Sequence, residues 1–176
     1  MTTYPTCYHN SALHPSEKFP AANVPLESCD EVMEYYTSAG IAPEKLNVGI
    51  AFFSKIPPAA TKSALDLSTL QEVLGITGIT MNYQQLLEKV LNNPDSGFVR
   101  EWDEVAMVPY LTYPDKNDIP QFAITYEDPE SLQYKAQFIQ QNNYGGAVIW
   151  QLRQDYETIL QTALSNALNG TSDVIV

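Results

Sequence analysis

The sequence has few basic residues and no long apolar run. Its 176 residues include 9 Lys and Arg against 21 Asp and Glu, and the formal net charge is -12. Nucleic-acid binding needs Lys and Arg to neutralise phosphates, so this balance argues against a nucleic-acid partner. No apolar run approaches the roughly 20 residues that span a bilayer, so we expect no membrane segment. Polar, proline-bearing sequence follows Met1, and we expect no signal peptide in this chain.

Cysteine and histidine are also scarce, with two of each. The spacing of Cys7 and Cys29 fits no metal-binding pattern and leaves two alternatives open, a disulfide in a secreted protein or two free thiols. His9 and His14 have no metal-ligating neighbours in the sequence, and we expect them on the surface. We therefore predict no metal and no cofactor.

What is present suits one ordinary α/β domain. Hydrophobic residues make up 44% of the chain, enough for a packed core, but the length falls short of the roughly 250 residues of a complete eight-stranded α/β barrel. Ser28 and the acidic residues after it predict a helix over 29–39, closed by Gly40. A buried strand is expected over 46–53.

The pattern changes after this strand, where Pro57 and Pro58 interrupt it. Residues 56–120 have a mixed pattern and are predicted to be an insertion. The elements expected in this insertion are one helix and two short strands, at 82–92, 98–102 and 106–113. The wound α/β pattern then resumes with a strand, a helix, a strand and a helix, at 121–126, 129–142, 145–150 and 155–168.

The most informative segment is Gly145–Asp155, with the sequence GGAVIWQLRQD. Two glycines allow a tight turn, a short apolar strand follows, and Trp150 stands at its carboxyl end. Barrel strands present ligand-facing side chains at that end. These residues alone leave open the alternative of a buried tryptophan that ends an ordinary α/β strand.

Several segments, in order, resemble the C-terminal part of family 18 glycoside hydrolases, the chitinases. The segments are Asn23–Leu26, Gly40–Lys55, a stretch from Tyr83 to Tyr110, Thr125–Ala136 and Gly145–Asp155. The resemblance implies an α/β fold that is the C-terminal part of a (β/α)8 TIM barrel with a small α+β insertion, incomplete on its own. Residues 1–55 would hold the sixth-strand region, a helix and strand seven, residues 56–120 the insertion, and residues 121–176 a helix, strand eight and the final helix.

The departures from the family pattern concern catalysis. The family's acid lies in Asp-x-x-Asp-x-Asp-x-Glu, a pattern that this sequence does not contain, so we expect no catalytic residue in the chain. The segment Met1–Pro5 resembles the sixth-strand Met-x-Tyr-Asp only loosely, with proline in place of aspartate. Phe53 replaces the family's tyrosine, Lys55 its arginine, and Gln151 its acidic residue.

The resemblance also implies a set of sugar-facing residues. Trp150 would stack on the sugar at the cleavage point, with Phe53, Lys55 and Tyr4 beside it. Trp102 and Tyr110 would line the cleft wall, or form the core of the insertion. The candidate site residues are thus Trp150, Phe53, Lys55, Tyr4, Trp102 and Tyr110. Asp103 is expected to be solvated.

The function implied by the resemblance is hydrolysis of β-1,4 links in chitin, with N-acetylglucosamine oligosaccharides as ligands. This chain would contribute the sugar-binding cleft, and an N-terminal barrel portion, missing or in a separate chain, would supply the acid. A non-catalytic chitinase-like protein that binds glycans or serves in assembly is the alternative, and an unrelated small α/β domain is a third. The family predicts a secreted protein.

Overall fold

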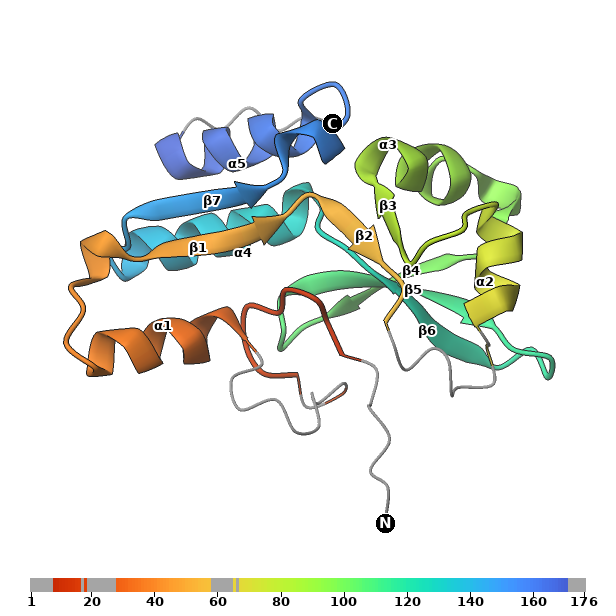
Figure 1. Cartoon of the computed structure of the whole chain (residues 1–176), viewed down its shortest axis with the longest axis horizontal. Coiled ribbons are helices and arrows are strands. Elements are labelled where there is room, and N and C mark those ends of the chain that lie inside the picture. Colours follow the sequence, from red (N-terminus) through yellow and green to blue (C-terminus); the bar gives the residue numbers. More distant parts are fainter. Residues whose placement is uncertain (1–7, 17, 19–27, 58–64, 66, 171–176) are drawn as a thin grey trace, which may run out of the picture.

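The computed structural model describes residues 8–16, 18, 28–57, 65 and 67–170. Its strands form a two-stranded parallel pair and a five-stranded antiparallel sheet, which lie side by side (Figure 1). Within the described residues, no helix is both long and apolar enough to cross a membrane.

The parallel pair consists of β1 (Asn47–Ala51) and β7 (Gly146–Trp150). Asn47 is paired with Gly146 at one end, and Ala51 with Trp150 at the other. The predicted strand over 145–150 and its parallel arrangement are confirmed. Since both strands run in one direction, their carboxyl ends lie at the same edge.

The start of the pair requires a glycine. The backbone N–H of Gly145 donates to the Leu46 carbonyl at 2.8 Å. A Cβ at position 145 would lie 2.5 Å from the carbonyl oxygen of Glu44. This approach explains the first glycine of the Gly-Gly turn, since any side chain would push the two strands apart.

Helices pack beside the pair as the sequence predicts: α1 (Cys29–Ser38), α4 (Pro129–Gln141) and α5 (Ile159–Asn169). Ser28 occupies the cap position of α1, but its hydroxyl donates to Asp30 and Glu31 instead of accepting a backbone N–H, so it is not the side-chain cap we expected. A short 3-10 turn, η5 (Leu152–Gln154), precedes α5. Helix α5 therefore begins later than the predicted residue 155.

The predicted strand over 46–53 is divided in two. β1 ends at Ala51, and β2 (Phe53–Lys55) joins the antiparallel sheet. Between them, Phe52 is buried, and its backbone N–H donates to the Trp150 carbonyl at 2.8 Å. One residue thus connects the two sheets.

The antiparallel sheet has the order β3-β2-β6-β5-β4. Its remaining strands are β3 (Thr80–Asn82), β4 (Val99–Asp103), β5 (Val108–Pro114) and β6 (Pro120–Thr125). The strand expected over 121–126 exists as β6, but it belongs to this sheet and not to the wound pattern. The reason is local: Asp115 accepts the backbone N–H groups of Asn117 and Ile119, and this turn closes a hairpin with β5. The division of the chain at residues 55 and 120 stays a prediction.

Helical segments pack into the same apolar core as this sheet. The expected helix over 82–92 is present as α3 (Tyr83–Leu86), which continues as a π-helical stretch, η3 (Leu87–Leu91). It starts at Asn82, which exchanges capping hydrogen bonds with Gln85. The two-turn helix α2 (Leu67–Leu74) was not predicted, because it is too short for a clear apolar period. Two further 3-10 turns lie in loops, η1 (Pro43–Lys45) and η4 (Pro94–Ser96).

One apolar core runs through both sheets and their helices. Val48 and Ile50 of β1 belong to this core together with Leu132 of α4, and Ile124 of β6 joins the same cluster. The antiparallel sheet therefore fixes the position of the parallel pair, and with it the site at the ends of β1 and β7.

Candidate functional site

A depression of about 340 Å³ lies at the carboxyl ends of β1 and β7. We call it the Trp150 depression. It is lined by Asn10, Ser11, Gly49, Ile50, Ala51, Phe53, Val148 and Trp150. The Trp150 side chain is 69% exposed, and its peptide bond to Gln151 is cis. An indole at this exposure presents an open apolar face to solvent, so Trp150 is not the buried core residue of the alternative explanation.

The parallel pair has one covered face and one bare face. Along β1, Val48 and Ile50 point into the core, whereas Gly49 between them is exposed. Along β7, Val148 is 55% exposed, and Trp150 points to the same side. An exposed valine in the middle of a parallel strand is unusual, because parallel strands are normally covered on both faces.

Phe53 and Lys55 follow directly after β1, on β2. Phe53 is half-buried and lines the Trp150 depression. The structure therefore brings two of the predicted site residues, Phe53 and Trp150, together. Lys55 lies two residues further along β2, paired with Thr80 and Thr125, and does not line the depression.

The aromatic residues of the antiparallel sheet lie elsewhere. Tyr110 is buried, with its ring stacked on Phe122 at a centroid distance of 5.2 Å. Trp102 is half-buried, and its ring lies 5.7 Å from that of Tyr134 on α4. Neither residue lines the Trp150 depression, and a place for them in the cleft wall stays a prediction. The remaining candidate, Tyr4, lies outside the described residues.

A buried ion pair holds one wall of the Trp150 depression. The ammonium of Lys135 on α4 donates to the Glu127 carboxylate, to the backbone carbonyl of Ser11 at 2.6 Å and to the Ser11 hydroxyl at 2.8 Å. The Ser131 hydroxyl donates to the other oxygen of Glu127 at 2.7 Å. Both charged side chains are almost completely buried. This network ties residues 10 and 11 to the interior of the protein.

A second buried cluster fixes the same segment to the antiparallel sheet. The imidazole of His9 lies 3.0 Å from the Asp103 carboxylate, and the Ser16 hydroxyl donates to the same carboxylate at 2.6 Å. Two expectations were therefore wrong: His9 is buried and not on the surface, and Asp103 is buried and not solvated. The carboxylate escapes the cost of burial because it accepts four hydrogen bonds, including the N–H groups of Val105 and Ala106.

Burial shifts the ionisation of both groups in this cluster. Desolvation lowers the pKa of His9, although its hydrogen bond to Asp103 acts in the opposite direction. Desolvation raises the pKa of Asp103, but the hydrogen bonds from Ala106, Ser16, His9 and Val105 together bring it below its usual value. The other histidine, His14, is partly exposed, and its ring nitrogen lies 2.6 Å from the Asp30 carboxylate.

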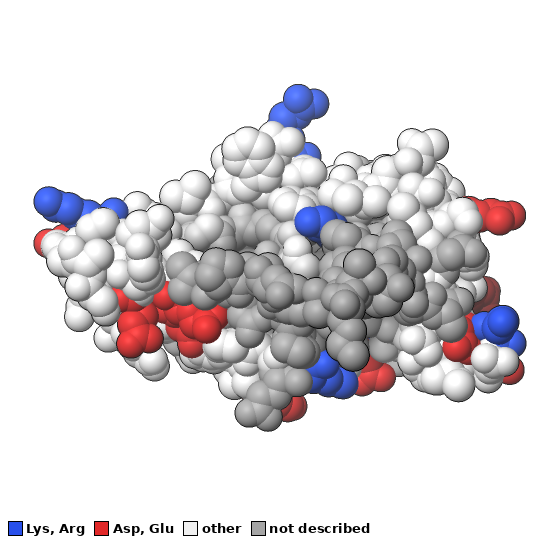
Figure 2. Space-filling view, turned by 60° about the horizontal axis from the view of Figure 1, so that its bottom comes forward, with Lys and Arg blue, Asp and Glu red and all other residues white. Residues whose placement is uncertain are grey.

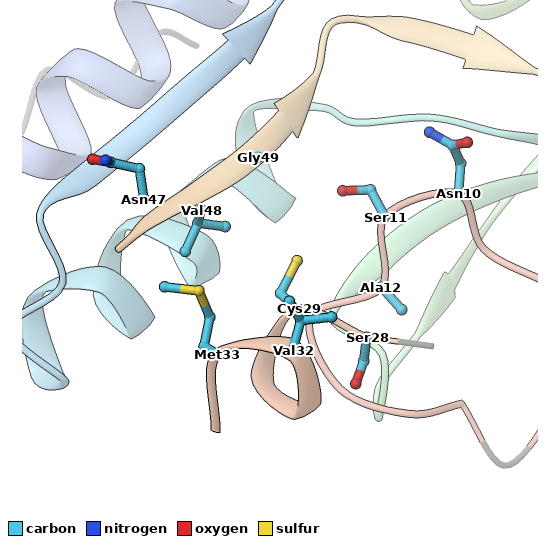
Figure 3. Close-up of a pocket in the computed structure, with 10 residues that line it drawn as sticks. All are labelled: Asn10, Ser11, Ala12, Ser28, Cys29, Val32, Met33, Asn47, Val48 and Gly49. Atoms are coloured by element: carbon cyan, nitrogen blue, oxygen red, sulfur yellow. The ribbon is translucent and has the colours of Figure 1, made fainter. Parts of the chain in front are cut away.

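A second pocket, of about 300 Å³, lies between β1, α1 and residues 10–12 (Figure 3). The thiol of Cys29 points into it, beside Val32 and Met33. Burial raises the pKa of the Cys29 thiol above its ordinary value, which favours the protonated form. Its proposed disulfide partner, Cys7, lies outside the described residues.

The surface charge of the described residues gives no sign of a polyanion site. On the face shown in Figure 2, acidic side chains gather on the side where α1 lies, and the basic ones are dispersed. No group of three or more His, Cys, Asp and Glu side chains that would suit a metal ion occurs in the part of the chain that the structure describes.

Sequence reasoning missed the two buried clusters. Ser131 and Lys135 lie within the segment Thr125–Ala136 that resembles the family pattern, and their spacing of four residues places them on one helical face, which is a usable signal. Asn10 and Ser11 carry no local signal, because only the fold brings them to the strand ends.

Comparison with known proteins agrees with this arrangement. Chitinase A1 of Niallia circulans is 27% identical over 165 residues, which cover 89% of this chain and 22% of the relative. Chitinase B of Serratia marcescens is 38% identical over 74 residues, 42% of this chain and 14% of the relative. The structure of chitinase ChiA74 from Bacillus thuringiensis superposes with a TM-score of 0.70 at 26% identity, over 95% of this chain and 29% of that one.

The chain thus spans less than a third of the length of these relatives. The structural neighbours are family 18 chitinase barrels, and the shared region contains both β1 and β7. The family model for glycosyl hydrolases family 18 matches residues 4–155. Since this match extends over most of the sequence and the fold agrees with it, the protein belongs to glycosyl hydrolase family 18.

Proposed function

We propose that this chain is the C-terminal portion of a chitinase-like barrel and that the Trp150 depression is its part of the sugar-binding cleft. The observation that carries the proposal is the position of Trp150: exposed, at the carboxyl end of the last strand, and next to Phe53. Ligand-binding residues of α/β barrels occupy this end of the strands. The exposed indole suits stacking on a pyranose ring.

The rest of the barrel completes the cleft in this proposal. Two parallel strands with an exposed face do not form a stable sheet by themselves, and among the described residues no third strand pairs with either edge of β1 and β7. The remaining strands, whether in a separate chain or in the same polypeptide, would cover Val148 and pair with these edges. The small share of the relatives that this chain spans supports that inference.

The chain contributes binding and not the proton donor. Family 18 hydrolysis, as the resemblance implies, uses the substrate's own acetamide as nucleophile and needs one carboxylic acid at the leaving oxygen. The sequence lacks the Asp-x-x-Asp-x-Asp-x-Glu pattern that supplies this acid. The acid is therefore assigned to the remaining barrel portion. The extracellular location expected from the family stays part of the proposal.

A non-catalytic glycan-binding protein is the second candidate. It is favoured by Phe53, which lines the depression but lacks the hydroxyl of the family's tyrosine, and by Gln151, which is neutral where the family has an acid. The first change removes a hydroxyl and the second a negative charge, and both leave the stacking surface of Trp150 in place. The two candidates share the same ligand and differ only in hydrolysis.

The test of the shared ligand is titration of β-1,4-linked N-acetylglucosamine oligomers into the wild-type chain and the Trp150→Ala variant. We expect the variant to bind more weakly by about 1 to 3 kcal/mol, the worth of an aromatic anchor. Its unfolding free energy should change by no more than about 0.5 kcal/mol, because an exposed side chain contributes little to the core. Isothermal titration calorimetry and urea unfolding measure the two quantities.

Trp102→Ala is the matched control, since Trp102 packs on Tyr134 outside the depression. It should lower stability and keep the affinity. Unchanged affinity of Trp150→Ala, together with a large loss of stability, would contradict the proposal.

A further inference from the structure

One triplet of the sequence has the form Asn-x-Ser/Thr without a proline in the middle, and the proposed function makes no use of it. It is Asn169-Gly170-Thr171, at the end of α5. This triplet is the acceptor signal for N-linked glycosylation in proteins that pass through a eukaryotic secretory pathway. Because such triplets also arise by chance, the place of the asparagine in the fold decides whether it can carry a glycan.

Asn169 is the last residue of α5 and lies on the exposed side of this helix. By contrast, Leu160 and Leu164 are buried, and Leu168 packs against the core. Gly170 follows with a φ of 68°, and no atom lies within 4 Å of the position that a Cβ would take there. A glycan on the Asn169 side chain therefore extends into solvent and leaves the core undisturbed.

The hydrogen bonding of the Asn169 carboxamide is compatible with modification. Its Nδ2 donates to the Ser165 carbonyl at 2.8 Å and to the Ser165 hydroxyl at 3.3 Å. A carboxamide nitrogen carries two hydrogens, and a glycosylated one retains one of them. One donor thus remains for the Ser165 carbonyl, and the last turn of α5 does not depend on the unmodified side chain.

The end of α5 lies at the opposite end of the parallel pair from the Trp150 depression. The Gln140 carboxamide, in the last turn of α4, donates to the carbonyls of Ala167 and Leu168 at 3.2 and 2.9 Å. Helix α4 leads to the start of β7, and Figure 1 shows the last turns of α5 over that start. Since β7 has five residues and a strand rises about 3.3 Å per residue, Trp150 lies about 13 Å further along. A glycan at the end of α5 therefore leaves the depression open, and because helices form the outer ring of α/β barrels, it also leaves room for the remaining strands.

We propose that Asn169 is an acceptor site for N-linked glycosylation. The reaction joins the side-chain nitrogen of Asn169 to C1 of an oligosaccharide that is carried on a polyprenyl diphosphate. The bond from C1 to the diphosphate oxygen breaks, the polyprenyl diphosphate leaves, and the amide gives up one proton to a base of the oligosaccharyltransferase. Thr171, which lies outside the described residues, supplies the hydroxyl that the acceptor signal requires two positions after the asparagine. The inference rests on the extracellular location that is part of the proposed function.

Translation of the full chain behind a cleavable secretory leader, in the presence of microsomes, tests the acceptor directly. Glycans are attached there during translocation, so each variant gives a result even if it folds poorly. We expect the wild type to gain the mass of one glycan, which endoglycosidase H removes. Asn169→Gln and Thr171→Ala should gain none, and Thr171→Ser should be glycosylated in part. Asn166→Gln, on the same helix but outside any such triplet, is the matched control and should behave as the wild type.

The placement of the glycan is tested on the full chain secreted from yeast, before and after treatment with endoglycosidase H. We expect both forms to bind N-acetylglucosamine oligomers with affinities that agree within about twofold, because the glycan lies away from the depression. Both forms should also unfold at the same urea concentration, because the exposed end of α5 contributes little to the core. Calorimetry and urea titration measure the two quantities.

The inference is overturned if the wild-type chain enters the microsomes, with its leader cleaved, and gains no glycan. A glycan that persists in Asn169→Gln overturns it as well. If the glycosylated form binds the oligomers more than about tenfold more weakly than the trimmed form, the placement away from the depression is wrong. If neither form binds them while Asn169 carries its glycan, the proposed cleft fails and the acceptor site stands.

Discussion

At the scale of single residues, the most consequential feature is the buried pair of Glu127 and Lys135. Removing two charges from water costs several kcal/mol for each, and their attraction offsets this only when further hydrogen bonds satisfy both groups. Ser131 serves the carboxylate and Ser11 the ammonium. The buried ion pair therefore depends on the hydrogen bonds from Ser131 and to Ser11. Loss of one charged side chain leaves the other charge buried without a partner.

The variant Lys135→Met tests this arrangement. It should lower the free energy of unfolding by about 3 to 5 kcal/mol, because the carboxylate of Glu127 stays buried without its partner. The double variant Glu127→Leu with Lys135→Met should lose less than Lys135→Met alone, since no uncompensated charge remains. Urea unfolding of both variants provides the comparison, and equal losses would show that the stranded charge is not the cause.

The His9–Asp103 cluster predicts a pH dependence. Both groups have a lowered pKa in the folded state, so the unfolded chain binds protons more readily, and stability falls on acidification. For His9 the loss begins as the pH drops below about 6.5, the ordinary pKa of histidine, and for Asp103 below about 3.9. The first step should be smaller in His9→Gln, when unfolding is followed by urea titration at a series of pH values. A wild-type stability that does not change between pH 7 and 5 would be inconsistent with this account.

Neither cluster was predictable from local sequence. His9 and Asp103 are separated by 94 positions, and Lys135 by 124 positions from Ser11. Propensity and periodicity report on neighbours along the chain, whereas these contacts are set by how the two sheets meet. Trp150 was predictable because a strand end is a local feature.

At the scale of elements, the start of α4 joins the two sheets. Asp128 caps the helix by accepting the N–H of Ser131 at 3.0 Å, and its other oxygen accepts two hydrogen bonds from Arg100 on β4. Arg100 also donates to Glu130 in the first turn. One carboxylate therefore both starts the helix and fastens it to the antiparallel sheet.

Two substitutions separate these roles. Asp128→Asn keeps an oxygen for the cap and loses the charge that faces Arg100. We expect it to cost less than about 1 kcal/mol of unfolding free energy, since the Arg100 side chain is 38% exposed and the pair is screened by water. Asp128→Ala also loses the cap and should cost about 0.5 to 2 kcal/mol more. Chemical unfolding measures both. Equal costs would show that the side-chain cap adds nothing.

The elements themselves were largely predictable, and their pairing was only partly so. The helix of Pro129–Gln141 has a capping residue, a first-turn proline and an apolar stripe, and all three are local. The strand expected over 121–126 has the right composition, but a hairpin turn at Asp115 pairs it with β5. Strand pairing depends on partners distant in sequence, and a three-residue strand such as β2 has no measurable period.

At the scale of the whole molecule, the parallel pair has an exposed face, and within the part of the chain that the structure describes no further strand pairs with its edges. Its two strands receive their fixed geometry from Phe52, which continues into the antiparallel sheet, and from the core beneath them. The family barrel would supply neighbours for the other sides. In our proposal the site at the strand ends is one part of a cleft. Among the described residues, its lining offers a stacking ring and an amide but no acid.

We predict that the isolated chain does not hydrolyse chitin. We expect no turnover of chitin oligosaccharides from about pH 4 to about pH 9, because no carboxylic acid lines the Trp150 depression among the residues that the structure describes. Chromatographic analysis of oligosaccharide products after long incubation is the measurement. Turnover that persists on repurification and disappears on substitution of a carboxylate in this chain would refute it.

The bare face of the β1–β7 pair also governs how the protein behaves at high concentration. Exposed Val148 and Trp150 attract one another between molecules, while the net charge of -12 keeps the molecules apart. Acidification removes that charge, and concentrated salt screens it over distances longer than a few ångströms. Colloidal stability is thus a balance between a hydrophobic strip and a long-range repulsion, and preparations should stay clear in dilute, mildly alkaline buffer.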